Sequence, residues 1–295
     1  MIWAEITVNT NRLAEDAVAS ILIDEGCRGA ATASPSASSL EADVSGYLPV
    51  DDLLEGRLEA IKGRIRRLKE AFEDDVGSLE ITLRKLDETD WAEAWKSYYK
   101  PFAVGRVVVK PSWETYQPEA GQIVIELDPG MAFGTGQHPT TQLCIMALQE
   151  YISGGESVAD IGTGSGLLAI TAAKLGARKV YAIDIDSVAV EAAAENVRRN
   201  GLEDTVFVWQ GDTLSGLPEN VDVIVANIVP NVIMDLAAQA SAVLKPGGIM
   251  ISSGIILERE ADVIARLQSV GLETVKVERD GSWVAVHSRK GGGEG

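Results

Sequence analysis

Hydrophobic positions in the second half of the chain predict strands and helices in alternation. From Glu156 onward, short apolar runs typical of buried strands are separated by stretches with apolar residues at helical spacing. We expect strands at 158–161, 180–185, 206–210, 221–226 and 248–252, helices at 167–175, 187–200, 230–244 and 258–270, and two closing strands at 274–277 and 283–287. This order predicts a seven-stranded α/β sheet that is parallel except for an antiparallel edge.

The first 87 residues follow a different order of elements. Strands are expected at 2–8, 29–30, 44–48 and 79–86, and helices from the capping signal Asn9-Thr10-Asn11 to about residue 25 and from 51 to about 72. The resulting β-α-β-β-α-β order is that of a ferredoxin-like α+β sandwich. That fold hosts many functions and no catalytic motif occurs here, so we interpret residues 1–87 as a substrate-recognition domain.

Residues 88–103 connect these two patterns and are rich in aromatic side chains. The run WAEAWKSYYKPF is typical of a helical linker, with aromatic side chains at Trp91, Trp95, Tyr98 and Tyr99. Two interpretations stay open: a peptide-binding patch, or side chains that simply fasten the linker to a neighbouring domain. The catalytic domain is then expected to cover 104–295 and to open with short strands at 106–110 and 122–127.

The composition narrows the class of partner. The chain has 295 residues, enough for two domains, with 26 basic and 44 acidic side chains and a formal net charge of −18. A surface of this sign repels nucleic-acid phosphates and anionic lipids. We therefore expect a basic partner, no direct nucleic-acid binding and no membrane association; acidity that serves only solubility is the alternative.

Cysteine usage and the terminal segment indicate the cytoplasm. Cys27 and Cys144 are too few for a disulfide framework and lack the spacing of metal ligands. The N-terminus has neither the basic nor the apolar region of a signal peptide, and polar residues interrupt the longest apolar stretch, 221–244. We expect a cytoplasmic protein without a metal site, and a monomer.

A glycine-rich turn, DIGTGSGL at 160–167, follows one predicted strand and precedes a helix. Glycine lets the backbone turn sharply and approach a ligand where a Cβ would clash, so Gly162 and Gly164 are candidate cofactor contacts. A dinucleotide fingerprint requires a small residue at the position of Leu167. The turn therefore argues against pyrophosphate binding, and with Asp160 before the first glycine it resembles the loop that holds the amino-acid portion of S-adenosylmethionine (AdoMet); a nucleotide site and a plain tight turn are the alternatives.

Two carboxylates lie at the ends of the next two strands. Asp184 follows Gly162 by 22 residues, close to the roughly 20 expected for a carboxylate that binds ribose hydroxyls. Its neighbour Asp186 is expected to cap the following helix. Asp212, after the strand 206–210, is a weaker candidate for contact with the adenine amino group, and a turn-forming role is its alternative.

Asn227 closes the strand 221–226, at the edge where ligands bind in such sheets. An asparagine oxygen accepts a hydrogen bond from an amine and leaves the nitrogen lone pair aimed at an electrophilic methyl group. Asn227 is therefore the candidate for orienting an amine substrate. A helix cap before Pro230 is the alternative interpretation.

The most specific run is DPGMAFGTGQHPTT at residues 128–141. Three glycines, a histidine and a threonine pair lead into a predicted helix. A loop of this kind suits closure over a ligand, with Thr140 or Thr141 donating to it. We interpret His138 as a structural residue of the loop rather than a general base or zinc ligand, because His287 is the only other histidine.

Taken together, these runs resemble one family. DPGMAFGTGQHPTTQLC, VADIGTGSGLLAITAAKLGA, AIDID and ANIVPNVI are similar to the motifs of the PrmA family of ribosomal-protein lysine methyltransferases, over nearly the whole chain. The resemblance implies a Rossmann-like class I AdoMet methyltransferase domain behind a recognition domain. It implies AdoMet contacts at Thr141, Gly162, Asp184 and Asn227, and loop closure by Phe133 and Gly134. The aromatic fourth residue common in other amino-methylating enzymes is absent from the run that begins at Asn227.

The activity implied by the resemblance is N-methylation of lysine side chains and an α-amino group on a ribosomal protein, the large-subunit stalk-base protein eleven. A neutral amine would attack the sulfonium methyl group in line, and the acidic surface would suit a basic substrate. Alternatives are a class I methyltransferase that acts on another basic protein, an RNA or a small molecule, and a non-catalytic AdoMet-binding module.

Overall fold

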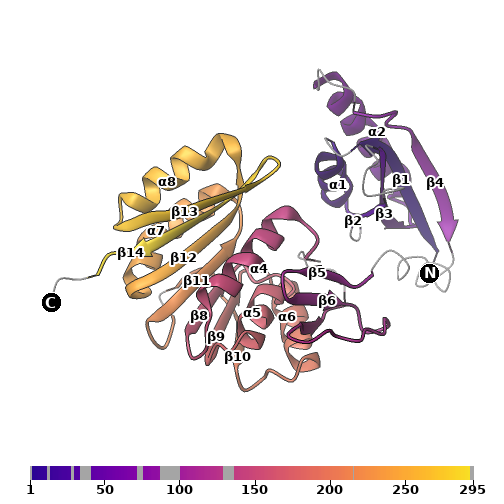
Figure 1. Cartoon of the computed structure of the whole chain (residues 1–295). Helices are drawn as coiled ribbons and strands as arrows, with labels where there is room; N and C mark the ends of the chain where they lie inside the picture. Colours follow the sequence, from indigo (N-terminus) through magenta and orange to yellow (C-terminus); the bar gives the residue numbers. More distant parts are fainter. Residues whose placement is uncertain are drawn as a thin grey trace. The chain divides into compact units, whose positions relative to one another are not determined.

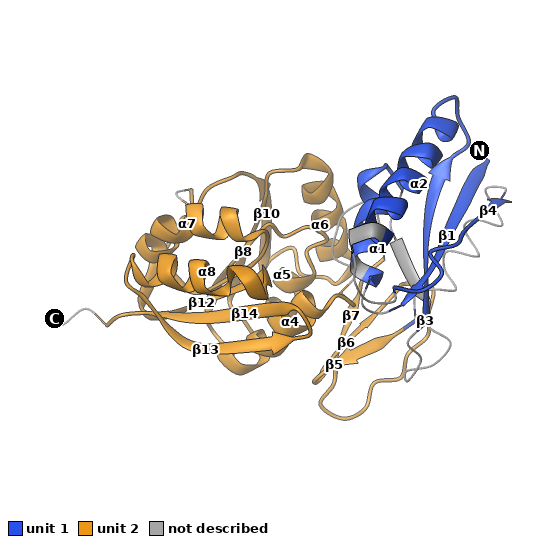
Figure 2. Ribbon diagram, turned by 90° about the horizontal axis from the view of Figure 1, so that it is seen from above, with its two compact units in different colours: residues 1–100 blue, residues 101–295 orange. Residues whose placement is uncertain are grey.

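The computed structural model describes residues 2–11, 14–27, 30–33, 41–71, 76–86, 100–128, 136–214 and 216–292. Contacts divide the chain into two compact units, Met1–Lys100 and Pro101–Gly295, which Figure 2 colours blue and orange. Among the helices of the described residues, none combines the length and the apolar character that crossing a bilayer requires. Each unit has its own sheets and core.

The first unit is a four-stranded antiparallel sheet with two helices (Figure 1). Its elements are β1 (Trp3–Asn11), α1 (Glu15–Asp24), β2 (Ala30–Ala33), β3 (Glu41–Pro49), α2 (Leu54–Ala71) and β4 (Ile81–Leu86). The strand order β2-β3-β1-β4, with antiparallel neighbours, is the predicted ferredoxin-like arrangement. Alternate residues of β1 and β3, including Ile6 and Val44, form one core with the apolar faces of α1 and α2.

The predicted helix cap at Asn9-Thr10-Asn11 is wrong, because these residues extend β1. All three pair with β3, and the Thr10 hydroxyl donates to the Val76 carbonyl over 2.9 Å. Helix α1 begins at Glu15, and the preceding residue, Ala14, makes no side-chain cap hydrogen bond. The polar residues that resemble a cap are satisfied by partners far away in the sequence, which a local pattern does not reveal.

Other predicted boundaries of this unit shift by a few residues. α2 begins at Leu54 rather than at 51, and β4 begins at Ile81 rather than at 79. Gly29, the end of the second helix at 72 and the linker aromatics at 91, 95, 98 and 99 lie outside the described residues. The last predicted linker positions, 102 and 103, belong to a strand, so the helical prediction is wrong there.

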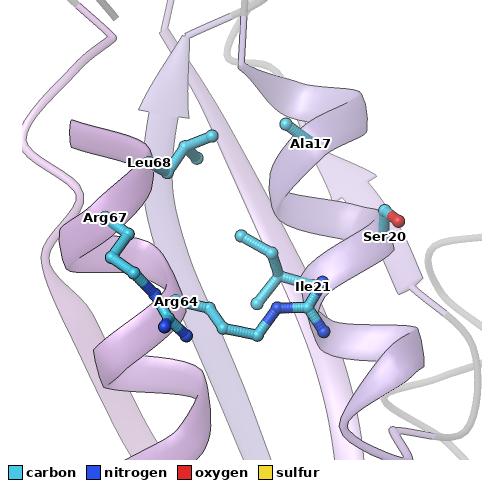
Figure 3. Close-up of a pocket in the computed structure, with 6 residues that line it drawn as sticks. All are labelled: Ala17, Ser20, Ile21, Arg64, Arg67 and Leu68. Carbon is cyan, nitrogen blue, oxygen red and sulfur yellow. The ribbon is translucent and has the colours of Figure 1, made fainter. Parts of the chain in front are cut away.

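A shallow hollow of about 460 Å³ lies between α1 and α2 (Figure 3). Its lining residues are Ala17, Ser20, Ile21, Arg64, Arg67 and Leu68. The Arg64 guanidinium pairs with Asp24 and Glu25, at 2.7 and 3.2 Å. Exposed pairs of this kind contribute at most about 1 kcal/mol. The two ion pairs connect α1 to α2 but add little stability. None of the candidate site residues of the sequence analysis lines the hollow.

The second unit opens with a small three-stranded sheet. β5 (Phe102–Val104) and β6 (Val107–Lys110) are antiparallel, and β7 (Ile123–Glu126) pairs with β6 in parallel. The sequence predicts β6 and β7 but not β5. Gln149 connects the β5–β6 turn to the helix that follows, because it accepts the Arg106 N–H over 2.8 Å and donates to the Val104 carbonyl over 3.0 Å.

A seven-stranded sheet between two helical layers makes up the rest of this unit. Its elements are α4 (Pro139–Tyr151), β8 (Ser157–Ile161), α5 (Leu167–Lys174), β9 (Lys179–Asp184), α6 (Ser187–Arg199), β10 (Val206–Gln210), β11 (Val221–Asn227), α7 (Pro230–Val243), β12 (Leu244–Ile256), the short 3₁₀ helix η1 (Leu257–Arg259), α8 (Glu260–Gln268), β13 (Leu272–Asp280) and β14 (Trp283–Lys290). The strand order is β10-β9-β8-β11-β12-β14-β13. β14 runs opposite to the other six strands, so the pairs β12–β14 and β13–β14 form the predicted antiparallel edge.

Each face of this sheet has its own hydrophobic cluster, because side chains alternate along a strand. Val180 and Val223 pack with α4, α5 and α6, whereas Tyr181 and Ile224 pack with α7 and α8. Figure 1 shows the helices on the two sides of the sheet. With both faces covered, a ligand reaches the parallel strands only at their ends.

Candidate active site

The carboxyl ends of four parallel strands carry the predicted site residues. Gly162 directly follows β8, Asp184 ends β9, Asp212 follows β10 and Asn227 ends β11. Because these strands are neighbours in the order β10-β9-β8-β11, the residues lie along one edge of the sheet. The topology therefore gathers side chains that are far apart in the sequence.

The glycine turn after β8 is held from two sides. Gly162 and Gly164 have φ angles of 69° and 54°, in the left-handed region that glycine adopts without strain. The Gly164 N–H donates to Asp184 Oδ2 over 2.8 Å, and Asn196 Nδ2 of α6 donates to the Ser165 carbonyl over 2.9 Å. The turn is thus a fixed backbone surface beside β9.

Space also requires glycine at position 162. A Cβ there would lie 2.3 Å from Ile228 Cγ2, far inside the roughly 3.5–4.0 Å optimum for two carbon atoms. Ile228 directly follows Asn227, so the turn after β8 touches the end of β11. Sequence reasoning missed Ile228, because only the pairing of β8 with β11 brings it to the turn.

Asp160 lies beneath the turn and is fully buried. Its Oδ2 accepts hydrogen bonds from Thr163 Oγ1 at 2.6 Å and from the Ala169 N–H at 3.0 Å. Oδ1 has no hydrogen-bond partner among the described residues. Burial raises the pKa of this carboxyl to about 7, and the two hydrogen bonds offset only part of that effect. Asp160 thereby ties the turn to the beginning of α5.

The Asp184 carboxylate accepts one backbone hydrogen bond at each oxygen. The donors are the N–H groups of Gly164, at 2.8 Å, and Asp186, at 3.0 Å. A carboxylate has about four acceptor positions, so Asp184 can also accept from two ligand hydroxyls. The prediction that Asp186 caps the next helix is confirmed, because its side chain accepts the Val188 N–H over 2.9 Å.

Apolar side chains are exposed next to Asp184. β9 ends one residue earlier than predicted, and Ile185 beyond it is 70% exposed; Val188 is 39% exposed. Gln210 Nε2 donates to the Ile185 carbonyl over 2.9 Å, which connects this segment to the end of β10. Asp212, two residues beyond the end of β10, is exposed. An apolar surface beside a carboxylate with acceptor capacity has the chemistry of a nucleoside site.

Asn227 and Thr141 are brought together by the fold. Asn227 Nδ2 donates to Thr141 Oγ1 over 3.1 Å, across the interface of β11 and the first turn of α4. Thr141 is buried and Asn227 is partly exposed. The alternative interpretation of Asn227 as a helix cap is wrong, because Val229 occupies the cap position of α7.

His138 occupies the N-cap position of α4, which fits the structural role expected for it. Its Nδ1 accepts the Thr140 N–H over 3.3 Å and lies 2.7 Å from Thr140 Oγ1. The imidazole also packs edge-on against Trp283, with ring centroids 4.8 Å apart. Trp283 begins β14 and pairs with Ile256 of β12, so only the antiparallel edge of the sheet brings it here. Sequence reasoning found no signal for it.

The segment 128–141 is described only at its two ends. Phe133 and Gly134, the predicted loop-closure residues, lie outside the described residues. Gly136 has a φ of 90°, and a Cβ on it would lie 2.7 Å from Leu167 Cδ2 and 2.9 Å from Phe102 Cζ. The end of the segment that leads into α4 is therefore pressed against α5 and β5.

The described residues offer no cluster of three or more metal-binding side chains. His287 is fully buried on β14, where Nδ1 lies 3.1 Å from the Tyr151 hydroxyl and Nε2 lies 3.2 Å from Glu278 Oε2. Burial lowers the pKa of this imidazole. Its partners belong to α4 and β13, so His287 takes part in helix–sheet packing rather than in the site.

Known proteins match this chain over nearly its whole length. The family model described as ribosomal protein L11 methyltransferase (PrmA) matches residues 2–291. This chain belongs to the ribosomal protein L11 methyltransferase family. The L11 methyltransferase of Alkaliphilus oremlandii is 43% identical over 310 residues, which cover 98% of this chain and 99% of that protein. That of Desulforamulus reducens is 44% identical over 306 residues and covers 97% and 98% of the two chains.

A solved structure agrees with membership of the L11 methyltransferase family. The crystal structure of the ribosomal protein L11 methylase from Lactobacillus delbrueckii subsp. bulgaricus has a TM-score of 0.61 and 36% identity, and covers 65% of this chain and 100% of that one. The family membership and this structure confirm the predicted class I methyltransferase fold and the predicted protein methyltransferase activity. The family does not favour the RNA, small-molecule or non-catalytic alternatives. The roles of the individual site residues stay predictions.

Proposed function

We propose that this member of the L11 methyltransferase family transfers methyl groups from AdoMet to lysine side chains and the α-amino group of ribosomal protein L11. The observation that carries the proposal is the hydrogen bond from Asn227 to Thr141. It orients an amide at the same sheet edge as the glycine turn and Asp184. An amine-orienting group therefore lies beside a nucleoside-type surface.

The residues at this edge fit AdoMet. Asp184 has acceptor positions left for ribose hydroxyls, and the turn presents backbone at Gly162 where a Cβ would not fit. We assign Asp212 to the adenine, and Gly164, Thr141 and Asn227 to the remaining cofactor contacts. AdoMet, when bound, supplies an electrophilic methyl group on a sulfonium. Phe133 and Gly134 are proposed to close over it.

Asn227 orients the attacking amine. Because its Nδ2 donates to Thr141 Oγ1, the orientation of the amide is set and Oδ1 is left to accept an N–H from the substrate. An amine that donates to Oδ1 keeps its lone pair for in-line attack on the methyl carbon. Free lysine has a pKa of about 10.4, so the ammonium first releases a proton to water. The contribution of the protein is then alignment and exclusion of water.

Charge and domain organisation suit a basic protein substrate. The net charge of −18 speeds encounter with a basic ribosomal protein. In this proposal residues 1–87 recognise the substrate, 88–103 connect, and 104–295 catalyse. The enzyme acts as a monomer in the cytoplasm, where ribosomal proteins are made, and does not bind nucleic acid itself.

Intact-mass spectrometry of purified L11 incubated with the enzyme and AdoMet tests the proposal, with Asp184→Ala as the control variant. Stepwise gains of one methyl mass that are absent with the variant are expected. If L11 gains no mass while calorimetry still detects AdoMet binding, the assigned substrate is wrong. If AdoMet does not bind, the assigned site is wrong.

A further inference from the structure

Helix α6 contacts the cofactor side of the proposed site. It begins shortly after Asp184, and in its last turn Asn196 Nδ2 donates to the Ser165 carbonyl of the glycine turn over 2.9 Å. The packing is close there, because a Cβ on Gly166 would lie 3.1 Å from Ala193 Cβ. The glycine turn is therefore fastened to α6.

The C-terminal end of α6 holds a different segment. Asn200, which follows the last helical residue, accepts the Glu126 N–H at Oδ1 over 3.1 Å and donates from Nδ2 to the Glu126 carbonyl over 2.7 Å. Glu126 ends β7, one of the two edge strands of the small sheet. The Asn200 amide pairs with this edge as a neighbouring strand would.

Asp128, two residues beyond β7, is also held by α6, through an ion pair with Arg199, and by Ser112. Its carboxylate accepts the Ser112 N–H over 2.6 Å and the Ser112 hydroxyl over 2.8 Å, and it pairs with the Arg199 guanidinium. The Arg199 and Asp128 side chains are each only 24% exposed, so water screens this pair less than a surface pair. Asp128 is the first residue of DPGMAFGTGQHPTT, and Thr141, the partner of Asn227, is the last.

We propose that Arg199 and Asn200 are positioning residues for methyl transfer, an inference that rests on the proposed function. They set where the segment 128–141 begins relative to the cofactor turn. The contacts to the turn, at Ala193 and Asn196, and those to the segment, at Arg199 and Asn200, lie within about 10 Å along one rigid helix, so α6 fixes the separation of the two sides. In-line transfer depends steeply on the placement of the groups that hold the amine and the cofactor.

Kinetics of Arg199→Met in the full chain, with L11 and AdoMet each varied, test the inference. Arg178→Met is the matched control. Arg178 pairs with Glu219 at 2.5 Å and precedes β9, at the opposite end of that strand from Asp184. We expect kcat of Arg199→Met to fall about tenfold to a hundredfold while the AdoMet Kd stays within about twofold, and Arg178→Met to retain kcat.

Two further variants separate positioning from general support. Arg199→Lys keeps the cation but not the guanidinium fork, so it should recover part of the lost kcat. Asn200→Asp keeps the acceptor for the Glu126 N–H but cannot donate to its carbonyl, so it should repeat the pattern of Arg199→Met. If Arg199→Met and Arg178→Met lose kcat equally, in proportion to a lowered Tm, both ion pairs only support the fold and the inference is wrong.

Hydrogen exchange provides a readout that does not need L11. AdoMet should slow exchange in the peptide 136–142, which contains Thr141, of the wild type and of Arg178→Met, and should slow it less in Arg199→Met. Equal protection in all three proteins would overturn the inference. Failure of the wild type to methylate L11, with this difference in protection present, would overturn the proposed substrate and leave the positioning role supported.

Discussion

Gly162→Ala tests the close contact between the glycine turn and the end of β11. A φ of 69° costs an alanine about 1–2 kcal/mol. The new Cβ would lie 2.3 Å from Ile228 Cγ2, and overpacking of this kind adds about 1–3 kcal/mol. Because the turn binds AdoMet in the proposed function, a distortion of about 2 kcal/mol or more should weaken AdoMet binding at least roughly 30-fold.

Second substitutions at Ile228 separate the two costs. In the Gly162→Ala background, Ile228→Ala removes Cγ2, and the next nearest atom, Ile228 Cβ, is 3.8 Å from the new methyl group. The double variant should retain only the backbone cost of about 1–2 kcal/mol. Ile228→Val keeps a methyl group at the position of Cγ2 and should recover nothing.

The assay is calorimetric titration with AdoMet, in parallel with urea unfolding of each variant. Single substitutions at Ile228 supply the baselines of the double-mutant comparison. Equal recovery by alanine and valine at position 228 would refute the steric reasoning. Wild-type affinity of Gly162→Ala would remove the turn from the AdoMet site altogether.

The remaining predictions concern three carboxamide and carboxyl side chains. Asp184→Ala leaves the Gly164 and Asp186 N–H groups without their acceptor and removes the proposed ribose contact. The binding free energy of AdoMet, measured by calorimetry, should therefore weaken by about 1.5–3 kcal/mol. Unchanged affinity would exclude Asp184 from the site. Asn227→Ala should lower kcat about a hundredfold and weaken AdoMet binding less. A loss confined to AdoMet affinity would leave Asn227 with its cofactor contact alone and would refute the amine-orienting role. Burial raises the pKa of Asp160 from 3.8 to about 7, so this carboxyl binds a proton in the folded state at pH values where it is ionised in the unfolded state. As the pH is raised from 4 to 7, the free energy of unfolding of the wild type should therefore fall by up to about 4 kcal/mol relative to that of Asp160→Asn. Urea unfolding of both proteins across this pH range measures the difference. Parallel pH profiles of the two proteins would contradict the prediction.

Local patterns predict the strands of the large sheet well, because buried parallel strands are continuous apolar runs that need no partner to be recognised. Local patterns predict element boundaries less well where polar residues form hydrogen bonds with residues far away in the sequence. Asn9-Thr10-Asn11 has the composition of a helix cap, yet pairing with β3 and the bond from Thr10 to the Val76 carbonyl place it in β1. A stretch of a few residues does not reveal that a polar side chain forms a long-range hydrogen bond instead of a local one.

The candidate site divides in the same way. Sequence alone determined the glycine turn, Asp184, Asp212 and Asn227 as a group, since carboxyl ends of parallel strands share one edge of the sheet. Tertiary structure decided which of them touch. Asn227 meets Thr141, and Gly162 meets Ile228, through strand pairing and helix packing that bring distant residues within about 4 Å of each other. Periodicity specifies which face of an element is buried, but only the packed fold specifies what lies against it.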